Sequence, residues 1–178
     1  NCPLIVLPDA DLEQAAAATA IGGYVNAGQV CISTQRIYAH RKVYGDFIDA
    51  LKPKVEAIPM GAPLEDATRL GPLISESEAV RVESWLREAV EQGGQLLTGG
   101  KRNGAVVTPA IVTEGNPTMK LMNDELFGPA VAISAISSAV CFDLDLVGIG
   151  LLLLLGCFPG RYQMMVLALN VLPDFEDH

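Results

Sequence analysis

A single cysteine stands where the sequence changes from a helix-like to a strand-like pattern. Gly28-Gln29-Val30-Cys31 follows an alanine-rich stretch and precedes Arg36–His40, which has the pattern of a β-strand. Gly28 permits a tight turn, and the backbone N–H groups of a turn, together with the amide of Gln29, could stabilise negative charge. An accessible thiol in this setting can act as a nucleophile. A structural thiol is the commoner fate of a single cysteine, and the local pattern alone favours that alternative.

The other cysteines and the histidines do not form a metal-binding pattern. The cysteine spacing matches neither C-x-x-C pairs nor zinc ligand sets, so we expect no metal site. His40, nine residues beyond Cys31, would have to be the base of a thiol hydrolase, but no orienting carboxylate is evident. The remaining members of the two sets are Cys2, Cys141, Cys157 and His178.

Three helices are predicted along the chain, one before the cysteine segment and two after it. Residues 12–25 are dominated by alanine, which allows close packing, and Asp9 is the candidate N-cap. Apolar residues at steps of three and four over residues 43–58 predict one buried helix face. Ser75-x-x-Glu78 fits a capping box, and the helix that it opens has an apolar stripe extending to Val90.

Strands alternate with these helices. This alternation predicts an α/β fold with a mostly parallel sheet and flanking helices. The apolar run that opens the chain is typical of a strand buried on both faces. The expected strands cover residues 4–7, 35–40, 95–98, 105–112 and 130–133.

Composition narrows the class of protein. The 178 residues are 50% hydrophobic and carry a formal net charge of −9, as expected for a globular and acidic protein. Without a basic excess, nucleic acid and anionic membrane surfaces are poor partners. The N-terminal residues lack a basic and apolar leader pattern, so we expect reduced thiols and a cytoplasmic location.

The composition changes near Ser138. We therefore expect one domain over residues 1–138 and an atypical apolar tail over residues 139–178, in which Arg161 is the one basic residue. The uncharged run over residues 146–158 is shorter than the roughly 20 residues that a membrane-spanning helix needs, so a membrane anchor is not favoured. A reading-frame change or an alternative exon end would explain such a tail.

Several segments, in order and at matching separations, resemble the catalytic domain of the aldehyde dehydrogenase superfamily. The resemblance covers about residues 1–138 and favours Cys31 as a nucleophile over a structural thiol. The segments are Ile5-Val-Leu-Pro-Asp-Ala-Asp-Leu12, Gly28-Gln-Val-Cys31, Leu70-Gly-Pro-Leu-Ile-Ser75, Leu97-Thr-Gly-Gly100 and Glu125-Leu-Phe-Gly-Pro129.

The resemblance implies NAD(P)-dependent oxidation of an aldehyde to a carboxylic acid through a cysteine thiohemiacetal and thioester. By resemblance, Cys31 is the nucleophile and its backbone N–H contributes to the oxyanion hole. Val30 and Ile32 flank the thiol and are expected to contact the substrate. Glu125 matches the residue that hydrogen-bonds the nicotinamide ribose of NAD or NADP, and Phe127 matches the aromatic residue beside the nicotinamide ring.

The chain also departs from the family pattern. The general-base glutamate and the dinucleotide-binding domain of the family lie upstream of the strand with which this sequence opens, so we expect a partial catalytic domain with little or no turnover of its own. A homo-oligomer is expected for a full-length member. The alternative function is a non-catalytic interaction module or pseudoenzyme.

Overall fold

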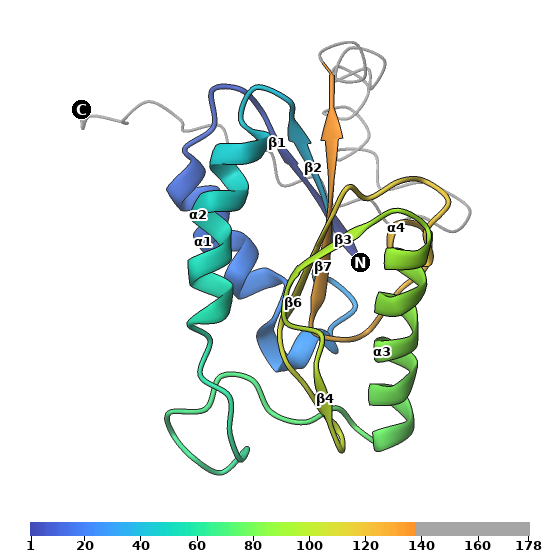
Figure 1. Cartoon of the computed structure of the whole chain (residues 1–178). Helices are drawn as coiled ribbons and strands as arrows, with labels where there is room; N and C mark the ends of the chain where they lie inside the picture. Colours follow the sequence, from blue (N-terminus) through green and yellow to red (C-terminus); the bar gives the residue numbers. More distant parts are fainter. Residues whose placement is uncertain (138–178) are drawn as a thin grey trace, which may run out of the picture.

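A five-stranded sheet lies at the centre of the structure, a computed structural model that describes residues 1–137. The strand order is β1-β2-β7-β6-β3, in which the first four strands run parallel and β3 is antiparallel to β6 (Figure 1). The predicted α/β fold with a mostly parallel sheet is confirmed. In sequence order the strands of the sheet are β1 Cys2–Val6, β2 Thr34–His40, β3 Gln95–Thr98, β6 Ala110–Thr113 and β7 Ala130–Ile136; β4 Arg102–Asn103 and β5 Val106–Val107 form a separate two-stranded ribbon.

Helices cover both faces of this sheet. In Figure 1, α1 and α2 pack together on one side, and α3 lies with the short α4 on the other. The α-helices are α1 Leu12–Gly22, α2 Tyr44–Glu56, α3 Glu76–Glu91 and α4 Lys120–Asn123, and a 3-10 segment, η1 Val25–Gly28, follows α1.

The predicted helices are present, with corrections to one N-cap and to one residue of a buried stripe. Asp11 rather than Asp9 is the N-cap of α1, because its side chain accepts a hydrogen bond from the backbone N–H of Gln14 at 3.0 Å. Ser75 caps α3 as predicted and accepts from the N–H of Glu78 at 3.3 Å. Val90 is exposed and does not belong to the buried stripe, because the steps of three and four along α3 place Ala89 on the buried face and turn the next residue away from it.

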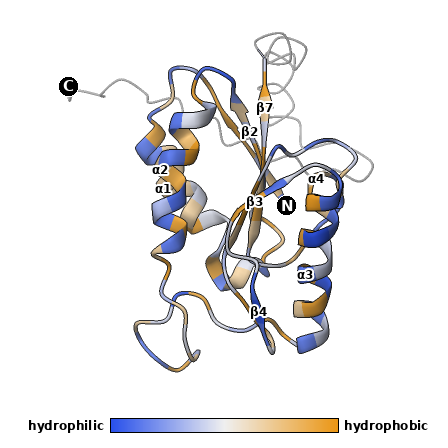
Figure 2. Cartoon of the chain, viewed as in Figure 1, coloured by the Kyte–Doolittle hydropathy of each residue, from blue (hydrophilic) through white to orange (hydrophobic). Residues whose placement is uncertain are grey.

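Hydrophobic residues are frequent on the central strands, as the colouring of the ribbon in Figure 2 shows. All four residues of β6 are buried, as are the alternate residues Gln35, Ile37 and Ala39 of β2. The strand expected over residues 105–112 is divided at Pro109 into β5 and β6, because proline has no N–H for a sheet ladder.

Within residues 1–137, no helix is long and apolar enough to cross a membrane. The tail expected over residues 139–178 lies outside the described residues.

Candidate functional site

The cysteine segment and the Glu125–Pro129 segment meet at one edge of the sheet. Strands β2 and β7 are parallel neighbours in the register Arg36↔Ala132, so their amino ends lie side by side. Cys31 lies three residues before β2, and Glu125–Pro129 leads directly into β7. The topology therefore brings together two segments that are about ninety residues apart in the sequence.

The approach to the cysteine is a left-handed turn. Asn26, Ala27 and Gly28 have φ values of 51°, 55° and 71°, a conformation that costs a non-glycine residue such as Ala27 about 1–2 kcal/mol. Reciprocal hydrogen bonds offset this cost, because Asn26 Nδ2 donates to the carbonyl oxygen of Gln29 at 3.1 Å and Gln29 Nε2 donates to that of Asn26 at 3.2 Å. Three successive left-handed residues thus form the turn that leads from α1 toward Cys31.

Cys31 occupies the tip of the turn that follows. The N–H of Ser33 donates to the carbonyl oxygen of Val30 at 3.0 Å, which leaves Cys31 and Ile32 at the two central positions. Cys31 is exposed, Ile32 is 61% exposed, and Val30 is half-buried. The N–H of Cys2 donates to the carbonyl oxygen of Ser33 at 2.9 Å and ties the turn to β1. The thiol is accessible, as a nucleophile must be.

Two glycines hold the turn against the second segment. A Cβ atom added at Gly28 would meet the carbonyl group of Gly128, with its carbon at 2.5 Å. A Cβ added at Gly128 would meet Cγ2 of Val82 on α3, also at 2.5 Å. The cysteine turn therefore packs on the backbone of the Glu125–Pro129 segment, and that segment packs on the Val82 side chain of α3.

The second segment presents a carboxylate and an aromatic ring to the surface. The side chain of Glu125 is 48% exposed, and Phe127 is 40% exposed and has a φ of 54°. Leu126, between them, is completely buried. The structure thus brings all five predicted site residues to the same edge of the sheet: Val30, Cys31, Ile32, Glu125 and Phe127.

Gln29 has a different role from the one that its position suggested. Its Oε1 accepts from the backbone N–H of Ile74 at 2.9 Å, while its Nε2 is bonded within the turn. The amide therefore anchors the turn to the Leu70–Ser75 segment, so we no longer assign Gln29 to charge stabilisation at the thiol.

Of the two described cysteines, Cys2 and Cys31, Cys2 has the buried surroundings of a structural thiol. Burial raises its pKa, and the negative charge that Cys31 can carry raises it further, while the amino group of Asn1 and the Arg36 guanidinium lower it. The two thiols are close enough to interact electrostatically, but only Cys31 is exposed.

His40 lies too far away to act as a base for Cys31. It is the last residue of β2, whereas Cys31 precedes the first, and six strand steps alone span about 20 Å. His40 is buried, and its Nδ1 accepts from the N–H of Lys42 at 3.1 Å. The thiol hydrolase alternative is wrong for this pair. Within residues 1–137, no group of three or more His, Cys, Asp or Glu side chains could hold a metal ion.

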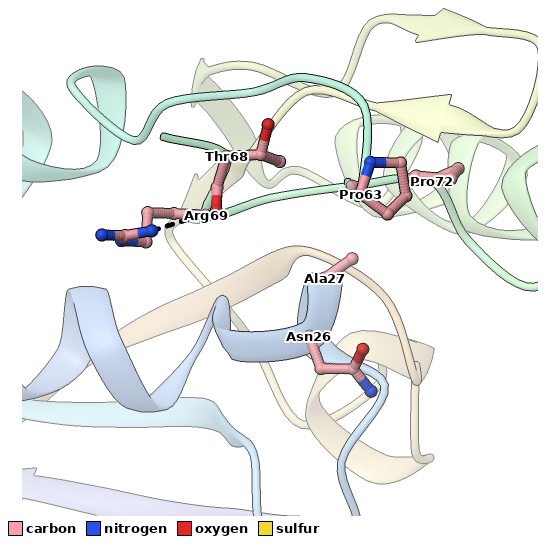
Figure 3. Close-up of a pocket in the computed structure, with 7 residues that line it drawn as sticks. Asn26, Ala27, Pro63, Thr68, Arg69 and Pro72 are labelled. Carbon is pink, nitrogen blue, oxygen red and sulfur yellow. Dashed lines mark hydrogen bonds between the residues drawn. The ribbon is translucent and has the colours of Figure 1, made fainter. Parts of the chain in front are cut away.

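A cavity of about 230 Å³ lies between the left-handed turn and the loop that contains Pro63 and Pro72. Asn26 and Ala27 face Pro63, Arg69 and Pro72 across it, as Figure 3 shows. The guanidinium of Arg69 donates to carbonyl oxygens of its own loop. Neither Cys31 nor the Glu125–Pro129 segment lines this cavity, so it is distinct from the space in front of the thiol.

Sequence inspection missed Gln35, which contributes three hydrogen bonds to the site. The signal was present, because Gln35 shares a strand face with Ile37 and Ala39 and is 2% exposed. A buried glutamine on an apolar face requires polar partners.

Comparison with known proteins identifies the fold. Residues 1–140 match the aldehyde dehydrogenase family. A 3-sulfolactaldehyde dehydrogenase from Priestia aryabhattai is 49% identical over 134 residues, which cover 75% of this chain and 28% of the relative. The chain therefore spans little more than a quarter of the length of the curated relatives that it matches.

Solved structures agree with this match. The NADP complex of a glyceraldehyde-3-phosphate dehydrogenase, GapN, from Methanocaldococcus jannaschii has a TM-score of 0.76 at 37% identity, over 79% of this chain and 31% of that one. A betaine aldehyde dehydrogenase from Staphylococcus aureus in complex with NAD+ has a TM-score of 0.73 at 31% identity, over 76% and 28%. The matching sequence, the parallel sheet and the shared topology show that this chain belongs to the aldehyde dehydrogenase family.

Proposed function

We propose that Cys31 is the nucleophile in the NAD(P)-dependent oxidation of an aldehyde to a carboxylic acid. The observation that supports this most directly is an exposed thiol on a rigid turn, packed through Gly28 and Gly128 against a segment with an exposed carboxylate and an exposed ring. An exposed thiol on a backbone fixed by glycine contacts has the accessibility and orientation that nucleophilic catalysis requires.

The reaction proceeds through a covalent bond to Cys31. The thiolate sulfur adds to the aldehyde carbonyl carbon, and the carbonyl electron pair moves to oxygen to give a thiohemiacetal. The backbone N–H of Cys31 is assigned to stabilise this oxyanion. Loss of the aldehyde hydrogen as hydride leaves a thioester, which water cleaves to release the acid and the thiol. Val30 and Ile32, on either side of the thiol, contact the substrate chain.

Glu125 and Phe127 fit the cofactor that this reaction needs. NAD or NADP, when bound, supplies the acceptor for the hydride. The half-exposed carboxylate of Glu125 can accept hydrogen bonds from ribose hydroxyl groups, and the exposed ring of Phe127 offers a face to the nicotinamide. Both residues precede β7, beside the cysteine turn.

The family domain of this chain is proposed to end near residue 138. The match to the family over residues 1–140 supports this boundary. Because the chain spans only 28% of the length of its relatives, we expect Cys31 in these 178 residues alone to add to an aldehyde or to be acylated by an activated ester, but NAD(P)-dependent turnover to be slow or absent. The relatives act, by their names, on chemically different aldehydes, so the assignment stops at the aldehyde class.

Two assays on the purified chain test this function. In the first, an activated ester such as p-nitrophenyl acetate should acylate wild-type protein in a burst and leave the Cys31→Ser variant unmodified. In the second, aldehyde with NAD+ or NADP+ is followed by NADH or NADPH absorbance. Rapid turnover by the 178 residues would contradict the proposed incompleteness. A Cys31 thiol inert to the ester would overturn the nucleophile assignment and favour a non-catalytic interaction module.

A further inference from the structure

The peptide groups around Leu126 are held by side chains from two different elements. The backbone N–H of Leu126 donates to Oε1 of Gln35 at 2.8 Å, and its carbonyl oxygen accepts from Nη2 of Arg81 at 2.6 Å. Gln35 belongs to β2 and Arg81 to α3, so the bonds reach Leu126 from the sheet and from a covering helix. We call these two side chains the Leu126 clamp.

Both the Nε2 and the Oε1 atoms of Gln35 form hydrogen bonds with this segment. Besides accepting from Leu126, it donates through Nε2 to the carbonyl oxygens of Leu121 and Asp124 at 2.9 and 3.0 Å. Because the side chain is buried, its loss would leave the N–H of Leu126 and the two carbonyl groups without these bonds away from water. Gln35 thus fixes the path of the chain from α4 to Leu126.

Arg81 fixes the other side of the same residue. Its Nε donates to Oε2 of Glu78 at 2.8 Å, and its guanidinium carbon lies 5.1 Å from the centre of the Trp85 ring. Held by a carboxylate and a ring of its own helix, the guanidinium has little freedom left. It therefore presents Nη2 to Leu126 from a fixed position.

The conformation of Phe127 explains why such a clamp is needed. A φ of 54° is unfavourable for a bulky side chain, and such a residue stays in that conformation only when its surroundings fix it. The carbonyl group of Leu126 forms the peptide bond with Phe127, and the N–H of Leu126 belongs to the peptide bond with Glu125. Holding both ends of Leu126 therefore orients the residues on either side.

We propose that Gln35 and Arg81 are positioning residues that orient Glu125 and Phe127 toward the nicotinamide half of NAD(P). The proposal rests on the proposed function and assigns to it two residues that act through their hydrogen bonds to Leu126. Because the cysteine turn has hydrogen bonds of its own, from Ile74 to Gln29 and from Ser33 to Val30, we assign the clamp to cofactor recognition and not to the thiol.

The test uses Gln35→Met, which keeps side-chain length without the hydrogen bonds, and Arg81→Met. Thr113→Val is the matched buried control for the first, since Thr113 lies at the opposite edge of the sheet, and Arg102→Met is the control on ion pairs of α3 for the second. All variants are made in the longest natural chain that carries these residues. The readouts are amide hydrogen exchange, the KM values for NAD(P)+ and aldehyde, and the rate of Cys31 alkylation by iodoacetamide.

The expected result is local. Exchange over residues 121–128 should rise by about tenfold in both clamp variants, since Gln35→Met loses buried hydrogen bonds and Arg81→Met loses a partly buried one, while β2 and β7 keep their protection. The KM for NAD(P)+ should rise by about fivefold or more, with the KM for aldehyde and the alkylation rate within about twofold of wild type. The Thr113→Val and Arg102→Met controls should change none of these.

Other results overturn one or both proposals separately. A rise in exchange throughout the sheet would make Gln35 and Arg81 general stabilisers, and an unchanged KM for NAD(P)+ would remove their link to the cofactor; each overturns the positioning role and leaves the proposed function intact. In the longest natural chain, wild-type protein that reduces no NAD(P)+ in the presence of aldehyde overturns the proposed function, and the cofactor role of the clamp with it. The same result for the 178 residues alone does not, because slow or absent turnover is expected of them.

Discussion

Cys2 and Cys31 lie near each other but in opposite surroundings. Cys2 is buried in the first strand, and burial raises its pKa, so its thiolate is rare near neutral pH. Cys31 projects from a turn that other side chains hold in place. Since the thiolate is the reactive form and must also be reached, the two residues should differ in alkylation rate for both reasons.

Limited alkylation measures this difference. At a pH of about 8, we expect iodoacetamide to modify Cys31 at least about tenfold faster than Cys2, because Cys31 is both exposed and free of the burial that disfavours the Cys2 thiolate. Peptide mass spectrometry after timed quenching separates the two sites. Unfolding the chain in urea is the control and should bring the two rates together. Earlier labelling of Cys2 than of Cys31 in the folded chain would contradict the burial described here.

At the scale of the elements, the contact between the cysteine turn and the Glu125–Pro129 segment requires a glycine at position 28. Gly28 has both a φ of 71° and a carbonyl group where its Cβ would lie. Either feature alone disfavours a larger residue, and the neighbouring group is backbone, which cannot rotate away. The site therefore tolerates no substitution at this position without separating the two segments.

Gly28→Ala should cost about 2–4 kcal/mol of the free energy of unfolding, from left-handed backbone strain and the clash together. Urea denaturation measures it. Gly45→Ala is the matched control, because Gly45 lies in α2 with no atom within 4 Å of an added Cβ. Because Gly45 is the second residue of α2, that change should stabilise by less than the about 1 kcal/mol that separates glycine from alanine in a helix interior. Equal effects of the two variants would disprove the close approach at Gly28.

The sequence predicts those features of these elements that depend on residues close together in the chain. Capping of α3 by Ser75 and the α/β alternation depend on residues a few positions apart, and both were confirmed. The left-handed turn at Asn26 and Ala27 and the anchoring of Gln29 to Ile74 depend on contacts with segments distant in the chain. Such contacts leave no periodic pattern, so Gln29 was interpreted from its neighbour Cys31 rather than from its actual partner.

The same limit applied to the candidate site. Cys31, Glu125 and Phe127 were picked out through resemblance to a family, and the structure places them at one edge of the sheet. Their placement required the β2–β7 pairing, which no local pattern reveals. Gln35 and Arg81 carry no family motif in this sequence and became visible only as hydrogen-bond partners of Leu126.

At the scale of the whole molecule, Tyr24 links the helix side to the far part of the sheet. It follows α1 directly, and its hydroxyl donates to the carbonyl oxygen of Ala110, at the start of β6, at 2.8 Å. The side chain is fully buried, and burial raises the pKa of its hydroxyl well above the ordinary value. Folding therefore requires Tyr24 to be protonated. Through this group, the free energy of unfolding decreases at alkaline pH.

The sign follows from linkage. Because the pKa is higher in the folded chain, the unfolded state releases the Tyr24 proton first, and stability falls as pH rises above about 10, the ordinary tyrosine value. The slope from this group approaches about 1.4 kcal/mol per pH unit. Tyr24→Phe loses the buried hydrogen bond, at about 1 kcal/mol, but also this dependence. In urea titrations, the variant should be less stable than wild type at pH about 8, and the two should become about equally stable near pH 11. Since the other tyrosines are common to both proteins, stability curves that run parallel across this range would show that Tyr24 is not the group whose protonation the fold requires.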